Sequence, residues 1–409
     1  MTLSHRRGNT FIILLLGALS VITPFAVDMY LPAFSLIAGE FKTTTSIISL
    51  SLSTYFIGFA LGQILYGPLL DRFGRKRPLY FGLAIYVLAS VGCAQAHDIR
   101  AFIVFRLIQA LGGCAAQVAS IAMVRDFFPV KQSAKIFSLL FLIIGVSPLL
   151  APTVGSAIMS GLGWRWIFTL LGCNAFAILA LTFFLLPEGH TPDPSISLRP
   201  KPIVQSFLAI LTQPQFVIYA LAGAFSFAGL FAYVAGSPLI FMDGFHLGTK
   251  AFGMVFATLT MGFIGGNQVN VFLLRKFSSG QIFLYALIFQ VVIGIVFFAG
   301  VRSHVFGLGA TLIMFFIFLS CIGLTYPNAA AIALAPFSKD AGSASALLGF
   351  LQMGVGALIS TGIGVLGASA IVSLLAGTAL ISLLILMAAK RSKVELVSGE
   401  ESEEVLFFH

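Results

Sequence analysis

Long apolar runs separated by short polar connections make up most of the sequence, and this alternation limits the possible folds more than any other feature. A helix that crosses a hydrocarbon core needs about 20 predominantly apolar residues. Runs of this length recur twelve times, and only 9% of all residues are charged. A segment in lipid must satisfy its own backbone hydrogen bonds, and a barrel would need short alternating strands instead. The runs therefore predict an all-α membrane protein with twelve transmembrane helices.

The twelve expected spans divide into two sets of six. A polar, proline-rich connection at residues 188–214 separates an N-terminal half, 11–187, from a C-terminal half, 215–389. Residues 1–10 are expected to form a cytoplasmic N-terminus, and the charged residues 390–409 a disordered cytoplasmic tail. The approximate bounds of the spans are Phe11–Ala38, Ile48–Leu70, Pro78–Ala96, Phe102–Phe127, Ala134–Ser160, Trp166–Leu186, Phe216–Phe241, Ala251–Leu274, Gln281–Val301, Val305–Leu334, Gly342–Leu366 and Ser369–Ala389.

The positions of Lys and Arg predict the orientation. The large majority of the 23 Lys and Arg residues lie in alternate connections, on the same side as the N-terminus. By the positive-inside rule, we expect both termini in the cytoplasm. A net charge of +9 would suggest nucleic-acid binding in a soluble protein, but here the cations are topology signals, so no nucleic-acid partner is expected.

The sequence lacks the usual signatures of metal sites and of hydrolytic enzymes. Its four cysteines fall inside apolar runs, without CxxC spacing or histidine partners, which argues against a disulfide framework or a metal site. It contains no G-x-x-x-x-G-K-[ST] loop and no H-E-x-x-H motif. We therefore expect no enzymatic activity, no cofactor and no metal.

The connection Gly67–Pro78 has an ordered polar pattern, Gly-Pro-Leu-Leu-Asp-Arg-Phe-Gly-Arg-Lys-Arg-Pro. Its glycines suit close backbone approach and a tight turn, and Pro78 suits the first turn of a following helix. A generic positive-inside loop would not require this order. The order G-x-L-x-D-R-x-G-R-K resembles the loop between helices 2 and 3 of the major facilitator superfamily of transporters. The resemblance implies two six-helix halves, and its conformational motif falls on Gly67, Asp71, Arg72, Gly74, Arg75 and Lys76.

Two ionisable residues, Asp28 and Arg106, lie well inside expected spans, where a charge is costly and calls for a reason. Asp28 is late in the first span and Arg106 is early in the fourth. These spans run in opposite directions, so both residues are expected at comparable depth in the outer half of the membrane. One hypothesis is a proton-responsive carboxylate that faces a cavity and is tuned by the arginine. The alternative is a structural ion pair that fixes helix register.

The surrounding residues resemble motifs of drug/proton antiporters. Arg-x-x-Gln-x-x-Gly-Gly, from Arg106 to Gly113, is similar to the fourth-helix motif of antiporters in this superfamily. Asp-Met-Tyr-Leu-Pro, from Asp28 to Pro32, resembles the first-helix signature of the bicyclomycin and chloramphenicol resistance family, Bcr/CflA. The resemblance implies that Asp28 and Arg106 act in proton coupling and substrate binding.

The fifth expected span has two prolines four residues apart, which remove backbone donors and bend a helix. Its small residues permit close helix contact. The segment resembles the fifth-helix antiporter motif G-P-x-x-G-G, with departures at Ala151 and Ser156. The alternative is a kinked helix without directional meaning. Within the pattern Pro152 and Gly155 match, and the residues assigned to this motif in the helix are Gly145, Pro148, Pro152 and Gly155.

Arg125-Asp126, at the inner end of the fourth span, is expected on the same side of the membrane as the Gly67–Pro78 connection. A cluster of Asp71, Arg75 and Asp126 could close an inner gate whose ion pairs break when the halves move apart. The alternative is a set of solvated loop charges with little energetic effect.

Polar residues within the spans are the candidates for lining a substrate cavity, although some must bond inside the helix bundle. The candidates are Tyr30, Gln109, Gln117, Tyr233, Asn328 and Gln352.

With these features, the resemblance implies a monomeric, proton-coupled multidrug exporter of a bacterial inner membrane, whose partners are a small-molecule substrate, protons and the lipid bilayer. Asp28 would exchange a proton for a small amphipathic compound while the two halves rock around the site. One alternative is an exporter or importer of a natural metabolite, such as an amino acid or a siderophore-like compound, on the same scaffold. Another is a membrane enzyme or receptor, which would require a convergent nucleophile–base or metal constellation.

Overall fold

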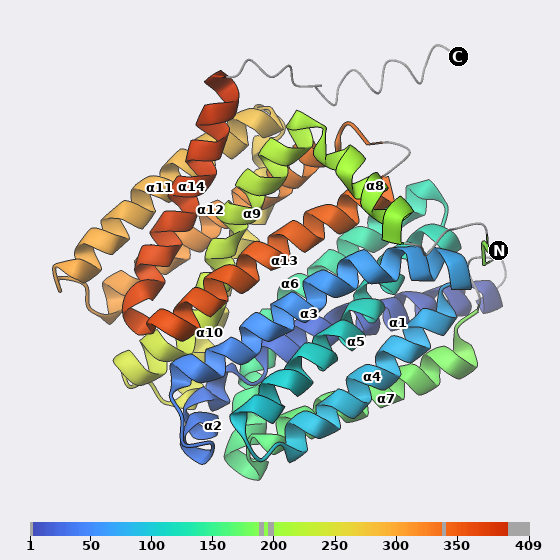
Figure 1. Cartoon of the computed structure of the whole chain (residues 1–409), viewed down its shortest axis with the longest axis horizontal. Helices are drawn as coiled ribbons and strands as arrows, with labels where there is room; N and C mark the ends of the chain where they lie inside the picture. The colour runs from blue at the N-terminus through green and yellow to red at the C-terminus, as the bar shows by residue number, and fades with distance from the viewer. Residues whose placement is uncertain (1–2, 188–191, 195–199, 338–340, 392–409) are drawn as a thin grey trace. The chain divides into compact units, whose positions relative to one another are not determined.

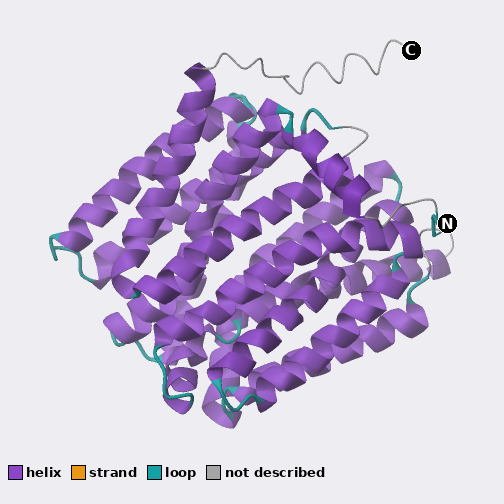
Figure 2. Cartoon of the chain, viewed as in Figure 1, coloured by secondary structure: helices purple, strands orange, loops and turns teal. Residues whose placement is uncertain are grey.

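The computed structural model describes residues 3–187, 192–194, 200–337 and 341–391, and within these ranges its regular structure is entirely helical (Figure 2). Eleven helical segments of this part are long and apolar enough to cross a membrane. The helix α10 (Thr249–Leu273) has a comparable length, but Asn267, Gln268 and Asn270 make its second half more polar. The all-helical membrane architecture is confirmed, and the count of twelve spans stays a prediction.

The chain forms two compact units. The first contains Met1–Arg199 together with Leu247–Ala257, and the second contains Pro200–His246 and Thr258–His409. The start of α10 therefore belongs to the first unit, where the hydroxyl of Ser156 donates a hydrogen bond of 3.1 Å to the carbonyl oxygen of Thr249.

The first unit is a helical bundle in which α5 packs on α1, α3 and α4, while α1 also packs on α6 and α7, and α4 on α7 (Figure 1). The elements are α1 (Leu3–Asp28), η1 (Leu31–Ala33), α2 (Phe34–Glu40), α3 (Thr45–Phe73), α4 (Lys76–Gln95), α5 (Ile99–Phe127), α6 (Val130–Leu162) and α7 (Arg165–Leu185).

The ends of these helices follow local sequence rules. Thr44 caps α3 by accepting a hydrogen bond from the backbone N–H of Ile47, and Asp98 caps α5 by accepting bonds from two backbone N–H groups. Gly74 ends α3 with a φ of 81°, and Gly163 ends α6 with a φ of 91°. Side chains other than glycine rarely adopt this region, so both positions favour glycine.

The α4–α5 contact brings the two backbones together. A Cβ atom at Gly112 would lie 2.5 Å from the carbonyl oxygen of Gly82 and 2.6 Å from the backbone nitrogen of Tyr86. Such distances leave no room for any side chain. Gly112, part of the fourth-helix motif, is therefore needed for helix packing in this structure.

The second unit has a corresponding arrangement. Here α9 packs on α12, α13 and α14, while α11 packs on α12 and α14. The long helices are counted as α1, α3, α4, α5, α6 and α7 in the first half of the chain and as α9 to α14 in the second. In both sets the first helix packs on the fourth, fifth and sixth, and the third packs on the fourth and sixth. This shared order of contacts is what an internal repeat produces. Besides α10, the elements from Pro200 onward are α8 (Pro200–Leu211), α9 (Pro214–Ser237), η2 (Pro238–Gly244), α11 (Ser279–Arg302), α12 (Leu308–Leu334), α13 (Ala341–Leu366), η3 (Ala368–Ala370) and α14 (Ile371–Arg391).

Polar bonds inside the second unit connect its helices. The Ser226 hydroxyl on α9 donates to the Gln290 amide oxygen on α11 over 2.7 Å and lies 2.7 Å from the Thr325 hydroxyl on α12. All three residues are buried. Each group therefore has a partner despite its apolar surroundings, as a membrane bundle requires.

The connection expected at residues 188–214 contains the short helix α8, which the sequence interpretation did not include. Pro200 lies at its first position, where a missing N–H costs nothing. Residues 188–191 and 195–199 of this connection, and residues 392–409 of the expected tail, lie outside the described residues.

Candidate functional site: a buried arginine, a buried acid and an ion-pair cluster in the first unit

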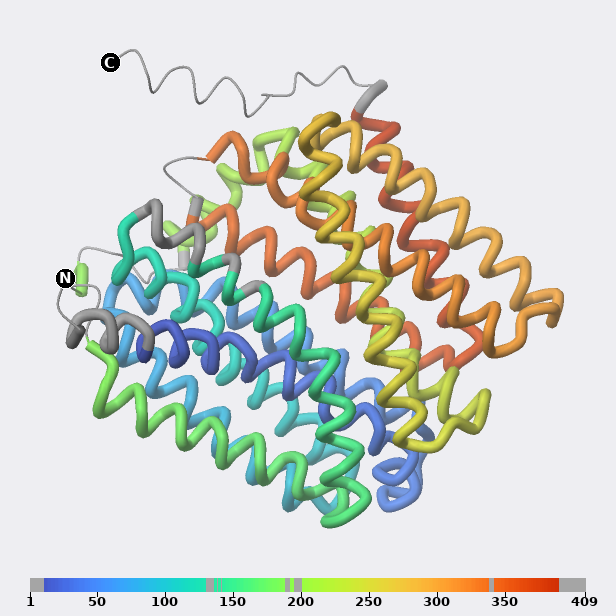
Figure 3. Tube along the Cα trace, turned by 180° about the vertical axis from the view of Figure 1, so that it is seen from behind, coloured from blue at the N-terminus to red at the C-terminus, as the bar shows by residue number. Residues whose placement is uncertain are grey.

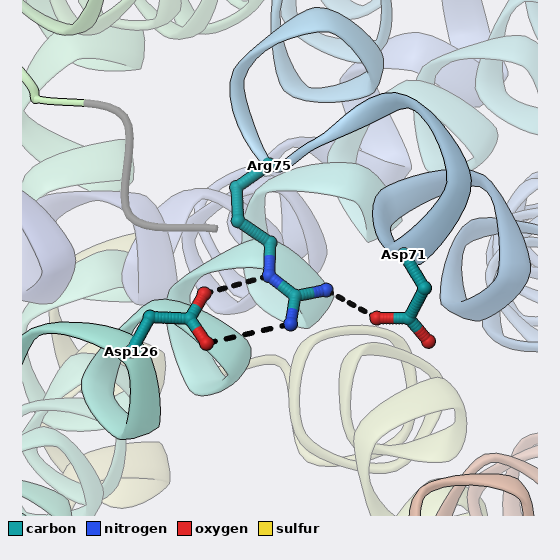
Figure 4. Close-up of polar contacts among 3 residues, drawn as sticks. All are labelled: Asp71, Arg75 and Asp126. Atoms are coloured by element: carbon teal, nitrogen blue, oxygen red, sulfur yellow. Dashed lines mark hydrogen bonds and ion pairs between the residues drawn. The ribbon is translucent and has the colours of Figure 1, made fainter. Parts of the chain in front are cut away.

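Arg75, Asp71 and Asp126 form an ion-pair cluster, as the sequence predicted (Figure 4). Arg75 follows α3, and its side chain reaches Asp126 at the end of α5. Its Nε donates to Asp126 over 2.7 Å and its Nη2 donates to the second oxygen of that carboxylate over 3.4 Å. Its Nη1 donates to Asp71, four residues earlier. We call these three residues the Arg75 cluster.

Burial makes the two ion pairs of this cluster unequal. The side chains of Arg75 and Asp126 are 10% and 12% exposed, whereas that of Asp71 is 46% exposed. Burial alone would lower the pKa of Arg75, but hydrogen bonds to Asp126 and Asp71 outweigh it, and the pKa of the guanidinium is raised. The pair with Asp126 is therefore the stronger one, since solvent screens it less.

The other residues of this motif have separate contacts. The guanidinium of Arg72 lies over the ring of Phe73, the ammonium of Lys76 lies 5.7 Å from the ring of Tyr80, and the guanidinium of Arg125 lies 6.0 Å from the ring of Phe137. Gly67 lies within α3, where a Cβ would meet nothing within 4 Å. Gly74 makes the left-handed turn between α3 and α4.

Arg106 is fully buried between aromatic rings. Its guanidinium carbon lies 4.4 Å from the ring centroid of Tyr30 on the α1–η1 turn and 4.3 Å from that of Tyr55 on α3. Two such cation–π contacts offset part of the cost of burying the charge. Its Nη1 donates to the amide oxygen of Gln109 over 2.6 Å, and the Gln109 amide nitrogen donates to the hydroxyl of Ser90 over 2.8 Å.

The other edge of the Arg106 guanidinium is open. Within the described residues, its buried Nε and Nη2 have no hydrogen-bond partner. These two N–H groups form the edge that can bind both oxygens of a carboxylate. An arginine held among three rings, those of Tyr30, Tyr55 and Phe168, with one edge unpaired is a candidate to receive an acidic group.

Asp28, the last residue of α1, is 4% exposed and makes no hydrogen bond or ion pair with any described residue. The direct ion pair with Arg106 considered from the sequence is therefore absent from this structure. Tyr30, two residues after Asp28, is the side chain of this segment that reaches Arg106. A similar depth in the membrane does not determine which way a side chain points, so it does not make Asp28 and Arg106 face each other.

The fifth-helix motif brings α6 against the backbone beside Asp28. A Cβ atom at Gly155 would overlap the carbonyl oxygen of Met29. Gly145, one of the other motif residues, has nothing within 4 Å of its Cβ position. Pro148 and Pro152 both lie inside α6. Gly155 is therefore the motif position where this structure requires a missing side chain.

A second polar cluster was missed by the sequence interpretation. The Glu40 carboxylate at the end of α2 accepts hydrogen bonds of 2.6 Å from Trp164 Nε1 and from Arg165 Nη2. Arg165 Nη2 also donates to the carbonyl oxygen of Ala96 over 3.0 Å. In the sequence, the one indication of this cluster was Arg165, because it is a cation in a connection that otherwise contains few cations. These bonds join the end of α2 to the start of α7.

Most of the expected cavity residues are buried inside the bundles. Tyr30 donates to or accepts from Ser51 over 2.8 Å, and Asn328 on α12 donates to Asn270 on α10 over 2.6 Å. Their use as substrate contacts therefore stays a prediction. The described positions are Tyr30 and Gln109 at 0% exposed, Tyr233 and Asn328 at 1%, Gln352 at 7%, and Gln117 half-buried.

Comparisons with known proteins agree on one superfamily. A family model described as the Major Facilitator Superfamily matches residues 16–361. The chain is 31% identical to an uncharacterized MFS-type transporter, YdgK, of Bacillus subtilis, covering 86% of this chain and 88% of YdgK. It is 30% identical to a bicyclomycin resistance protein homolog of Haemophilus influenzae, covering 87% of this chain and 90% of that protein.

A third relative and a solved structure are also similar to this chain. The multidrug resistance protein MdtL of Escherichia coli is 29% identical, over 90% of this chain and 93% of MdtL. Among solved structures, a D-xylose-proton symporter has a TM-score of 0.75 at 15% identity, covering 92% of this chain and 96% of the symporter. At this identity the structural likeness bears on the fold alone.

Proposed function

Because the chain belongs to the major facilitator superfamily, we propose that this membrane transporter is a proton-coupled exporter of small amphipathic drug-like compounds. The relatives named for bicyclomycin and multidrug resistance support this choice over a metabolite transporter. The proposal includes twelve spans, both termini in the cytoplasm, and a monomer in a bacterial inner membrane. The substrate and a proton would be exchanged by alternating access.

The observation that carries the proposal is the isolation of Asp28. Its carboxyl group lies in an apolar span, is 4% exposed and has no polar partner among the described residues. An ionised carboxylate is very costly in such a place, whereas a protonated carboxyl group is tolerated. We infer that Asp28 holds a proton in this conformation and releases it when the transport cycle exposes it to water.

Arg106 would provide the charged partner for the deprotonated state. Its Nε and Nη2 edge is free, and Tyr30 connects it to the segment that carries Asp28. A modest rotation at the end of α1 would bring the carboxylate of Asp28 to this free edge. Gln109 and Ser90 would hold the opposite edge of the guanidinium during this exchange.

The Arg75 cluster would act as the inner gate. Its three residues join the α3–α4 connection to the end of α5, so its ion pairs can stabilise one arrangement of these segments and break in another. Weakening the cluster should therefore change the rate of transport more than the binding of substrate.

The proposal can be tested with purified protein in liposomes loaded with a labelled drug, by imposing a pH step across the membrane. Asp28→Asn keeps the size of the side chain and removes its titration. We expect the variant to insert normally and to lose drug accumulation against a gradient. Arg106→Ala should be more disruptive, because it also removes the ring-stacked cation that packs the bundle.

Asp98→Asn is the matched control. Asp98 is an exposed acid that caps α5, and Asn is an equally good capping residue. The control variant should transport like the wild type. If Asp28→Asn still concentrates drug in response to the pH step, Asp28 is not the coupling residue. If the wild type moves no drug but moves a metabolite, the assignment as a drug exporter is wrong.

A further inference from the structure

The short helix α8 of the second unit has three exposed apolar side chains on one side. Val204, Leu208 and Leu211 are 51%, 55% and 40% exposed. Successive residues lie about 100° apart around a helix, so these three fall within an arc of about 60°. They form a continuous apolar strip along the 12-residue helix. We call these three residues the α8 strip.

A neighbouring side of α8 attaches it to the second unit. Ile210, only 2% exposed, belongs to a core cluster that also contains Ala344 and Leu347 of α13, and Phe207 packs against this cluster. The helix contacts both α13 and α9. Attachment of α8 therefore depends mainly on a side of the helix other than the α8 strip.

The position of α8 in the unit is where two membrane spans begin. Its last residue, Leu211, lies three residues before Pro214, where the span Pro214–Gly244 starts. Three residues of chain reach at most about 11 Å. Its other partner, α13, starts the span Gly342–Leu366. In both views α8 lies across the end of the second unit at which α9 and α13 begin (Figure 1, Figure 3). A helix in this position is at the surface of the bilayer.

The polar side chains of α8 lie next to the α8 strip. Around the helix, Lys201 is about 20° from Leu208 and Gln205 is about 60° from it. Both polar side chains are exposed. A helix in a membrane interface has this arrangement, with its apolar side at the acyl-chain boundary and its polar side in water. A lysine at the border can extend its ammonium group to the lipid phosphates.

We propose that α8 binds the surface of the membrane, with the α8 strip inserted among the lipids and Lys201 at the phosphate of an anionic lipid. The bilayer is the occupant of the strip because the start of α9 already places the helix at that surface. The same residues facing water would form an unfavourable exposed apolar patch. Because α8 directly precedes α9, this contact would hold the start of α9 at a fixed depth. It requires neither proton coupling by Asp28 nor drug export.

Photocross-linking from the α8 strip tests this contact on the full chain in lipid nanodiscs. Leu208→p-benzoylphenylalanine places a photoreactive ring in the strip. The matched control is Ala209→p-benzoylphenylalanine, at an exposed position about 100° away on the polar side. Mass spectrometry after irradiation should find roughly fivefold more lipid adduct at position 208 than at position 209. Equal adduct at both positions, or cross-links from position 208 to a second copy of the chain or to the first unit in place of lipid, would overturn the proposal.

The contact between Lys201 and a headgroup is tested in the Leu208→p-benzoylphenylalanine protein, in nanodiscs of phosphatidylcholine with a minority of phosphatidylglycerol. Phosphatidylglycerol should be enriched among the cross-linked lipids roughly threefold over its share of the bilayer, because a lysine near the surface attracts anionic lipid. Adding Lys201→Gln should abolish this enrichment. Adding Lys250→Gln, which removes an exposed lysine at the start of α10, should preserve it. Enrichment that survives Lys201→Gln would contradict the assigned headgroup contact.

A further measurement needs no variant. A phosphatidylcholine with a diazirine near the glycerol end of one acyl chain, photolysed with the wild-type protein in nanodiscs, should label peptides that contain Leu208 or Leu211. The peptide that contains Tyr285, which is 63% exposed on the span formed by α11, is the positive control. Labelling of the Tyr285 peptide without labelling of α8 would contradict the proposal. Because none of these measurements involves transport, failure of this proposal is distinguishable from failure of the proton-coupled export mechanism.

Discussion

Replacing Gly155 by alanine tests whether α6 lies against the segment that carries Asp28. The new methyl group would overlap the Met29 carbonyl oxygen, which is part of the backbone and cannot rotate away. Gly145→Ala places the same methyl group on the same helix, where nothing lies within 4 Å. The pair of variants therefore separates the effect of close packing from the intrinsic effect of alanine in a helix.

The expected magnitudes follow from two opposing effects. Alanine is favoured over glycine in a helix interior by about 1 kcal/mol. Overpacking costs about 1–3 kcal/mol, and a backbone obstacle puts Gly155 at the upper end. We expect Gly145→Ala to be neutral or stabilising by up to about 1 kcal/mol, and Gly155→Ala to be destabilising by about 2 kcal/mol. For a unit of roughly 200 residues, a difference of about 3 kcal/mol corresponds to about 6–12 °C in Tm.

Tryptophan fluorescence during heating in detergent provides the measurement. Both tryptophans, Trp164 and Trp166, lie at the start of α7, so the signal reports on the first unit. Liposome transport is measured in parallel, and Gly155→Ala should also lose uphill drug accumulation. A Gly155→Ala variant with the Tm and the transport of the wild type would show that α6 does not approach Met29 as closely as described here.

Two further substitutions address the polar clusters. Asp126→Asn should lower the stability of the first unit by about 2 kcal/mol, because it weakens a largely buried two-point ion pair of Arg75. Asp71→Asn removes the charge of a half-exposed partner, so it should cost less than about 1 kcal/mol. This second variant should slow transport, while expression and drug binding stay near normal. Thermal unfolding and liposome transport measure both, and an equal loss of stability would contradict the ranking. Glu40→Gln should lower stability by about 1 kcal/mol and shift the tryptophan emission, since Trp164 loses a charge-assisted hydrogen bond; an unchanged emission maximum would argue against that bond.

The sequence was most informative where one-dimensional patterns decide the structure. Long apolar runs predicted the helices, and the order of charged residues predicted the Arg75 cluster, because its members lie at helix ends whose positions the runs already define. The short helix α8 was missed because its prolines suggested a loop. Proline at Pro200 is equally compatible with a first helical turn, so composition alone could not distinguish the two.

The arrangement around Asp28 could not be predicted because it depends on how helices are rotated. Span directions and lengths gave similar depths to Asp28 and Arg106, but depth contains no information about which helix face a side chain occupies. The α1 segment presents Tyr30 to Arg106 instead. In the same way, the glycines of the fifth-helix motif are indistinguishable in the sequence, and only the structure separates the crowded Gly155 from the open Gly145.

The end of α1 is held on both sides of Asp28. Gly155 of α6 lies against the Met29 backbone, and Tyr30 is fixed by Ser51 and by the guanidinium of Arg106. Asp28 itself has no polar contact among the described residues. A proton that binds to or leaves Asp28 therefore changes the charge of a segment whose neighbours are already fixed. In the proposed mechanism, movement of the segment as a whole would lower the cost of that charge, and this movement would couple a single proton to a conformational change.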